Sequence, residues 1–233
     1  LLGLIIAGAV IGPHGLNLVL RDSSIILSGT AGLLYIMFLS GLDMDMSDFK
    51  KNSWRSLIFG LYTFCVPLGL GILAGYYILG FPIYSSILLA GLFASQTLIA
   101  YPIVSKLGIL FLFPLLAHWF FKHCSDSVSQ YIFVLAMVFL GAYLAHMAGL
   151  EPIIGAFLSG LALNRQIPRT SPLMNRIEFV GNAIFIPFFL IGVGMLIDYR
   201  AFFRDWESIE VAMVMIALIT LAKFLAAYFT QKT

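Results

Sequence analysis

The stretch SLIFGLYTFCVPLGLGILAGYYIL, residues Ser56–Leu79, decides the fold class of this chain. It runs for 24 residues without an acidic or basic side chain. An α-helix needs roughly 20 apolar residues to cross about 30 Å of bilayer hydrocarbon. This run therefore predicts a membrane-spanning helix.

Other apolar runs surround it on both sides. Those of spanning length are Ile25–Leu42, Tyr84–Val104, Gln130–Leu150, Val180–Ile197 and Ile209–Phe229, and the shorter ones are Leu1–Gly12, Gly108–Phe121 and Pro152–Asn164. The connections are short and leave no room for a second, soluble domain, so we predict an all-α membrane protein, a polytopic helical bundle. Leu1–Gly12 has no initiating methionine, basic n-region or cleavage site. We expect it to be the second half of a helix, and the chain to be a fragment at both ends.

The overall composition agrees with a membrane protein. Hydrophobic residues make up 61% and charged residues 10%, and the mean hydropathy is +1.01. Soluble domains are nearer 45–50% apolar and about 25% charged. A soluble enzyme, a disordered chain and a nucleic-acid binder are excluded. The 13 basic and 11 acidic residues are too balanced for a polyanionic partner, and two cysteines make no disulfide framework.

The basic residues indicate an orientation. Lys50, Lys51 and Arg55 cluster between two spans, which predicts a cytoplasmic loop by the positive-inside rule. Counted with these three, the twelve basic residues other than Lys223 divide most unevenly, nine inside to three outside, if Gly108–Phe121 does not cross and Pro152–Asn164 does. Crossing by the first run alone gives eight to four, and crossing by both gives six to six. The best count therefore requires an even number of crossings between Lys106 and Lys122.

Ser95, Gln96 and Thr97 place three consecutive polar side chains in the middle of a span, five residues before Pro102. Neighbours on a helix lie about 100° apart, so the three cannot share one face. Proline removes one helical hydrogen bond and leaves a carbonyl free. The combination predicts an interrupted helix that can bind a cation or proton carrier. Hydrogen bonding to neighbouring helices is the alternative explanation.

Lys223 is the only charge well inside a long apolar run. It is six residues, or about 9 Å, from the end at Phe229. Either it titrates beside a partner in the ion pathway, or its stem carries the amine to the interface. No carboxylate lies at a comparable depth in another run, so a partner would be absent from this chain.

The remaining patterns favour structural roles. Small residues at helix-contact spacings predict close packing: Gly69, Gly71, Gly75, Gly155, Ser159, Gly160, Gly192 and Gly194. The acidic run Asp43, Asp45 and Asp48 begins like a calcium loop but lacks the turn glycine and the final glutamate. The histidines have no metal-ligand spacing, and no hydrolase, ATPase or zinc-protease motif is present. We therefore predict no catalytic residue, metal or cofactor, and no enzymatic activity.

Several segments resemble the monovalent cation:proton antiporter-2 family, the Kef-type potassium and sodium/proton exchangers. The matching stretches are LLGLIIAGAVIGPHGL (Leu1–Leu16), LYIMFLSGLDMDM (Leu34–Met46), GLFASQTLIAYPIVSKLGI (Gly91–Ile109), EPIIGAFLSGLALN (Glu151–Asn164), IPFFLIGVGMLID (Ile186–Asp198) and VMIALITLAKFLAAY (Val214–Tyr228). They cover nearly the whole chain in the family's order.

This resemblance implies an inverted-repeat fold with interrupted helices, a midplane ion site bordered by Gln96 and Thr97, and Lys223 facing that site. It also implies a homodimer in a bacterial inner membrane that exchanges Na⁺ or K⁺ for protons. In the family, a helix with an essential aspartate follows the interrupted one. Here Lys106–Ile109 leads directly to Phe111–Phe121, which resembles the end of a later helix. We expect residues 1–233 to be a partial exchanger domain that lacks a segment near 109–111.

Three alternatives stay open. A chain without the aspartate helix could be a truncated membrane scaffold with no transport of its own. An organic-anion carrier of similar fold would need cationic groups or half-helix N-termini directed at a carboxylate, and Lys223 alone is thin support. An intramembrane enzyme such as an acyltransferase would need clustered catalytic histidines, and these are scattered.

Overall fold

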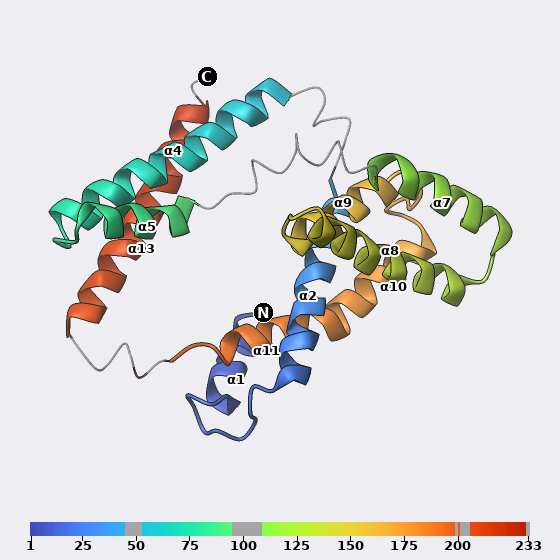
Figure 1. The fold of residues 1–233 in the computed structure, drawn as a ribbon, viewed down its shortest axis with the longest axis horizontal. Coiled ribbons are helices and arrows are strands. Elements are labelled where there is room, and N and C mark those ends of the chain that lie inside the picture. Colours follow the sequence, from blue (N-terminus) through green and yellow to red (C-terminus); the bar gives the residue numbers. More distant parts are fainter. Residues whose placement is uncertain (45–52, 95–108, 199, 201–205, 232–233) are drawn as a thin grey trace. The chain divides into compact units, whose positions relative to one another are not determined.

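We analysed a computed structural model of the chain, which describes residues 1–44, 53–94, 109–198, 200 and 206–231. The chain divides into two compact units. The first comprises Leu1–Met44 and Ala100–Tyr199, and the second comprises Asp45–Ile99 and Arg200–Thr233. Each is helical in its described part (Figure 1).

The first unit contains α1 (Leu2–Ile11), α2 (Ser23–Leu42), α7 (Ile109–His123), α8 (Ser127–Met147), α9 (Pro152–Leu163), α10 (Pro172–Val180), the π-helix η2 (Gly181–Phe185) and α11 (Ile186–Gly194). The second contains α4 (Ser53–Tyr77), α5 (Ile83–Ala94) and α13 (Trp206–Gln231).

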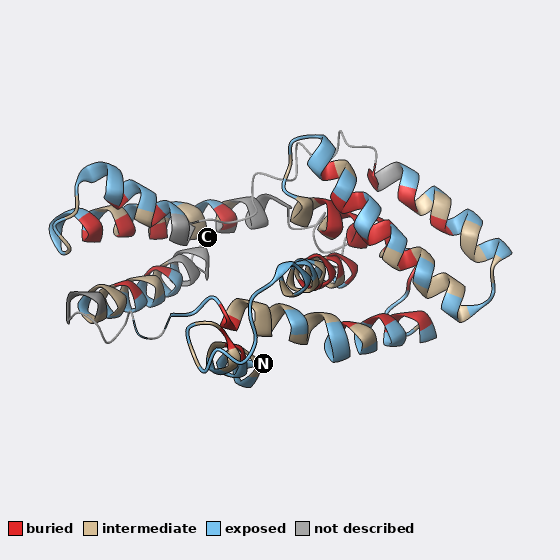
Figure 2. Cartoon of the chain, turned by 60° about the horizontal axis from the view of Figure 1, so that its bottom comes forward, coloured by how far each residue is buried: buried red, intermediate tan, exposed pale blue. Residues whose placement is uncertain are grey.

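Four helical stretches of the described chain are long and apolar enough to cross a bilayer. They are Ser23–Leu42, Gly60–Tyr77, Ser127–Met147 and Pro172–Gly194. Many of the large apolar side chains on these helices are exposed, and Figure 2 shows buried positions on the inner sides of packed helices. Exposed apolar side chains of this kind suit contact with lipid. The prediction of an all-α, multi-pass membrane protein is confirmed.

The element boundaries follow the predicted runs with two differences. The run predicted at Val180–Ile197 begins earlier, at Pro172, because the Ser171 hydroxyl caps that helix by accepting a hydrogen bond from the Met174 N–H (3.1 Å). The run Tyr84–Val104 is described as helix α5 up to Ala94, and its second half lies outside the described residues.

The short run predicted at Gly108–Phe121 is described from Ile109 onward, where it forms α7 (Ile109–His123), a helix of 15 residues. At 1.5 Å per residue it is about 22 Å long, less than the roughly 30 Å of hydrocarbon. It packs against α8 and α9, and Phe120 stacks on Phe133 of α8 at 4.4 Å.

α9 is the central helix of the first unit and packs against α2, α7 and α8. Most of its residues are buried. Its contacts are close because glycines face glycines at the crossings. A Cβ on Gly160 would collide with the carbonyl oxygen of Phe38 in α2, and a Cβ on Gly41 would collide with that of Phe157 in α9.

Two other crossings have the same reciprocal arrangement. At one of them, Gly141 of α8 lies against Gly155 of α9. At the other, a Cβ on Gly8 of α1 would collide with the backbone of α11, and a Cβ on Gly194 of α11 would collide with the backbone of α1. The packing role predicted for Gly155, Gly160 and Gly194 is thus confirmed.

In the second unit, α4 packs against both α5 and α13. A Cβ on Gly71 would lie 2.8 Å from the Ala90 side chain, and one on Gly75 would lie 2.8 Å from the Ser86 hydroxyl. Gly71 and Gly75 therefore act as predicted. Among the described residues Gly69 and Gly192 make no such close contact, since a Cβ on Gly69 would meet no described atom within 4 Å and one on Gly192 would come no nearer than 3.9 Å to one.

Candidate functional site

The polar triplet Ser95, Gln96 and Thr97 directly follows α5 and lies outside the described residues. Helix α5, which leads to the triplet, packs against α4. Ser86 is fully buried, and its hydroxyl donates to the backbone oxygen of Pro82 at 3.2 Å. This local bond satisfies the hydroxyl, so Ser86 can pack closely against the backbone of α4 without an unpaired polar group.

Lys223 lies on α13, in the same unit as α4 and α5. Ala222 is fully buried, while Lys223, the next residue, is exposed. A step of one residue turns about 100° around a helix, which explains the difference. Among the described residues, no carboxylate lies within ion-pair distance of the Lys223 amine.

The acidic run divides between described and undescribed residues. Asp43 is the C-cap of α2, and Asp45 and Asp48 lie outside the described residues. The Arg169 guanidinium donates to the Asp43 backbone oxygen, and its Nε lies 3.9 Å from the Asp43 carboxylate. A cation beside the last carbonyls of a helix opposes the negative end of its dipole. Within the described ranges, no group of three or more metal-ligating side chains occurs.

A second side chain hydrogen-bonds to this end of α2, and the sequence did not predict it. The Asn164 amide donates to the backbone oxygens of Leu42 and Met44, the latter at 3.1 Å. Asn164 directly follows α9, so it joins the ends of two crossing helices. Nothing in the local sequence pairs residues so far apart in the chain.

A buried polar contact in the middle of the first unit was also missed. The Tyr35 hydroxyl donates to the Ile177 backbone oxygen (2.9 Å) and lies 3.3 Å from the Tyr131 hydroxyl. Since a phenol has one proton, Tyr131 is the donor to Tyr35. The contact joins α2, α8 and α10 just before η2, and the Tyr35 ring stacks on Phe185 at 4.4 Å.

The π-helix η2 interrupts the long stretch Pro172–Gly194 two residues before Pro187. Proline has no N–H for the carbonyl four residues earlier, so the regular α-helical hydrogen-bond pattern is weakened at this point. π-helical turns occur often at functional positions. Pro187 was the available sequence signal for this interruption.

These features define a polytopic membrane protein with tightly crossed helices and, in its described part, a π-helical interruption at η2. A family model described as "Sodium/hydrogen exchanger, transmembrane" matches residues 1–111 and 99–233. The chain belongs to the sodium/hydrogen exchanger family.

Curated relatives agree with this assignment. The chain is 34% identical to a Na⁺/H⁺ antiporter of Synechocystis sp. over 288 residues, which cover 99% of this chain and 41% of the relative. It is 26% identical to the probable Na⁺/H⁺ antiporter 3 of Methanocaldococcus jannaschii, covering 97% of this chain and 72% of the relative. It is 22% identical to the K⁺/H⁺ antiporter 1 of Saccharomyces cerevisiae, covering 98% and 36%. The chain thus spans less than half the length of two of these relatives.

Proposed function

We propose that the protein exchanges a monovalent cation, Na⁺ or K⁺, for protons across the membrane by secondary active transport. The observation that carries the proposal is the match of both halves of the chain to the sodium/hydrogen exchanger family. The printed names of its relatives include sodium and potassium antiporters, so the cation stays open between these two. A transporter of this kind acts without catalytic residues or a cofactor.

In this proposal the ion pathway runs past Ser95, Gln96, Thr97 and Lys223. Hydroxyl and amide oxygens are suitable ligands for Na⁺ or K⁺. An ionisable residue inside a membrane span is a functional candidate by default. The exposed Lys223 amine and the end of α5 belong to one three-helix unit, and this supports their participation in one pathway.

We propose further that this chain lacks a segment that its relatives carry near residues 109–111. Two features support it: the family match falls into two parts that overlap at residues 99–111, and the alignment to the Synechocystis antiporter runs over 288 residues although the chain has 233. The segment would hold the carboxylate opposite Lys223. The absence of this segment and its carboxylate also favours the second candidate function, a membrane scaffold with no transport of its own.

The proposed location is a bacterial inner membrane, in agreement with the cyanobacterial relative. A homodimer is also proposed, on the family resemblance. Crosslinking of the chain in native membranes, followed by sizing of the product, tests the dimer separately from transport.

The decisive experiment compares the unmodified chain with a form that restores the coding sequence around codons 106–112. Both forms are expressed in a host that lacks its own antiporters. Everted vesicles are energised to form a pH gradient, and Na⁺ or K⁺ is added while a pH-sensitive dye reports dissipation. We expect the restored form to dissipate the gradient. Failure of both forms with both cations would overturn the exchange proposal and leave the scaffold.

Variants of the restored form test the pathway residues. Lys223→Gln and Gln96→Ala should each lower exchange on the order of tenfold, because the first removes a charge and the second a polar group from the hydrocarbon region. Lys122→Gln, at an exposed position in the last turn of α7, is the matched control and should exchange like the unmodified form. Equal exchange by Lys223→Gln and Lys122→Gln would remove Lys223 from the pathway.

A further inference from the structure

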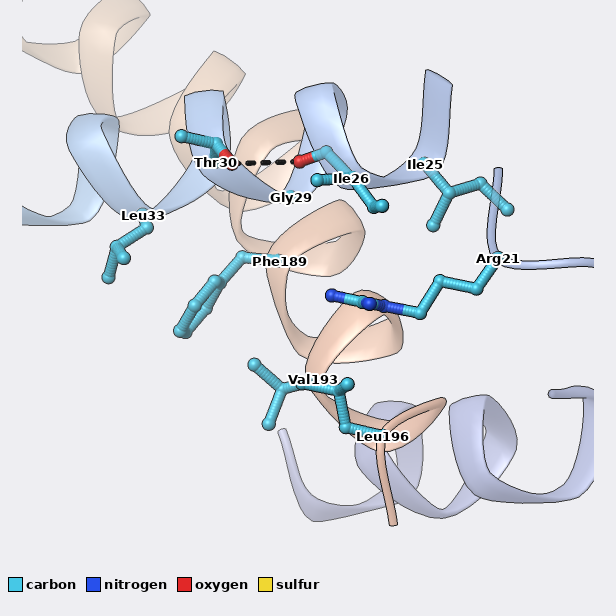
Figure 3. A pocket seen from close by; sticks show the side chains of 10 residues that line it. Arg21, Ile25, Ile26, Gly29, Thr30, Leu33, Phe189, Val193 and Leu196 are labelled. Carbon is cyan, nitrogen blue, oxygen red and sulfur yellow. Dashed lines mark hydrogen bonds between the residues drawn. The ribbon is translucent and has the colours of Figure 1, made fainter. Parts of the chain in front are cut away.

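A groove of about 170 Å³ lies between α2 and α11 in the first unit. Its walls are apolar side chains, among them Ile25 and Leu33 of α2 and Phe189 and Val193 of α11. Arg21 is the charged residue of this lining, and Figure 3 shows its guanidinium extending between the two helices toward Phe189. The groove therefore combines one cation with an apolar channel.

The Arg21 guanidinium is available to a ligand. It is exposed, and within the described ranges no side chain or carbonyl accepts a hydrogen bond from it. The neighbouring Asp22 carboxylate is already used as the N-cap of α2, where it accepts a hydrogen bond from the Ile25 N–H at 3.1 Å. Thr30, the hydroxyl in the lining, donates to the Ile26 backbone oxygen at 2.8 Å. The remaining walls thus offer an apolar surface.

The length of the groove along α2 is close to the hydrocarbon thickness of one bilayer leaflet. Arg21 precedes the first residue of α2, so it lies at the polar end of a spanning helix. From Ile25 to Leu33 the lining extends about 12 Å along the helix axis at 1.5 Å per residue. Half of a hydrocarbon core of about 30 Å is about 15 Å. The cation therefore lies at headgroup level and the apolar walls at acyl-chain level.

Two glycines leave the space open. Gly29 and Gly192 both line the groove. A Cβ at either position would come no closer than 3.9 Å to another residue, so neither glycine is required for helix contact. A side chain introduced at either position would therefore begin inside the groove, with its Cβ at an ordinary contact distance from the facing helix.

We infer that this groove binds an anionic phospholipid, with its phosphate at the Arg21 guanidinium and one acyl chain along Phe189 toward Leu33. A guanidinium pairs well with phosphate because its N–H groups match the phosphate oxygens. The volume is below the roughly 300–1,000 Å³ usual for enclosed small-molecule sites. That suits part of a chain lying in an open groove rather than an enclosed soluble solute.

The test measures lipid retention by the purified, delipidated chain with native mass spectrometry. Dioleoylphosphatidylglycerol and dioleoylphosphatidylcholine are the probes, since they share acyl chains and differ in net charge. We expect tighter binding of the anionic lipid. Arg21→Gln should lower that affinity about fivefold, the usual contribution of one cation at an anionic lipid surface, and Arg21→Lys should retain most of it.

Variants that fill the groove distinguish a lipid-binding site in the groove from simple attraction of the lipid to an arginine at the membrane interface. Gly192→Leu should lower retention of the anionic lipid as strongly as Arg21→Gln, although the guanidinium is untouched. Val193→Phe fills the groove from a second position, and serves if Gly192→Leu elutes abnormally in detergent. Arg165→Gln, an exposed arginine beside the opposite end of α2, is the matched control and should bind like the unmodified chain.

Three results would overturn the inference. One is equal affinity for the two lipids. Another is full retention of the anionic lipid by both groove-filling variants. The third is displacement of the lipid by soluble glycerol 3-phosphate, which would assign the cation to a soluble anion instead of a membrane lipid.

Discussion

The Asn164 side chain at the end of α9 donates a hydrogen bond to the backbone oxygen of Met44, 3.1 Å away, just beyond the end of α2. The same amide also donates to the Leu42 backbone oxygen. The last carbonyls of a helix have no partner within it, so a side chain from a crossing helix satisfies them here. The two residues tie together the C-terminal ends of two helices that also cross closely at Gly41 and Gly160, within the last turn of each.

Asn164→Ala should lower the free energy of unfolding by about 1–2 kcal/mol, because it removes two hydrogen bonds to half-buried carbonyls. Asn164→Asp should cost more, since it replaces the donor with an oxygen facing two carbonyl oxygens. Unfolding by SDS in mixed micelles measures both. Asn175→Ala, at an exposed position on α10, is the control and should change little. Equal stability of all three variants would show that the amide contributes nothing.

Gly160→Ala should destabilise the first unit by about 1–3 kcal/mol, the usual cost of overpacking. The added methyl would collide with the Phe38 backbone oxygen, which cannot move as a flexible side chain does. Gly69→Ala is the matched control, because a Cβ there meets no atom of the described residues within 4 Å and alanine favours the helix. Thermal denaturation in detergent should rank Gly160→Ala lowest and Gly69→Ala at or above the unmodified chain. The reverse ranking would contradict the close crossing of α2 and α9.

Tyr35→Phe should lower the free energy of unfolding by about 1–2 kcal/mol, because it removes the hydrogen bonds to Ile177 and from Tyr131. Tyr131→Phe removes one bond and leaves Tyr35 bonded to Ile177. Its cost should be nearer ~0.6 kcal/mol, an average for hydrogen bonds between membrane helices. Tyr143→Phe, exposed on the same helix, should be neutral. SDS unfolding of the three variants checks this order, and a larger loss for Tyr131→Phe would refute it.

Asp126, the N-cap of α8, makes stability depend on pH. Hydrogen bonds from the Ser129 N–H (2.9 Å) and hydroxyl (2.8 Å) hold the pKa of its carboxyl below its ordinary value. A lowered native pKa means that this stabilisation is present above the unfolded-state pKa and is lost as pH falls through the native value. Asp126→Asn should therefore reduce the stability difference between about pH 6 and about pH 3.

Ser129→Ala removes the hydroxyl donor and keeps the backbone one. It should return the pKa of Asp126 only part of the way toward its ordinary value. The unfolding midpoint in detergent, measured against pH for all three chains, checks the order. If the unfolding midpoint changed with pH in parallel for the unmodified chain and Asp126→Asn, the Asp126 cap would not contribute to the loss of stability in acid.

The sequence alone was sufficient for the fold class. Runs such as Ser56–Leu79 have the length and apolarity of a membrane span, and these properties depend on the bilayer rather than on neighbouring helices. The family was evident from the sequence as well, because ordered motifs such as Glu151–Asn164 are local strings of residues. The triplet at Ser95–Thr97 was predicted in the same way and stays a prediction.

Only the tertiary structure decided which residues meet. Gly69 and Gly71 have the same local pattern, yet within the described part of the chain a Cβ would meet the neighbouring helix at Gly71 and not at Gly69. Asn164 has no sequence signal for its bonds to the end of α2, which is 120 residues away at Met44. The groove at Arg21 likewise depends on α11 lying beside α2. Hydropathy fixes which segments enter a membrane. Close packing and hydrogen bonds between distant segments fix how they cross, and local composition does not encode those pairings.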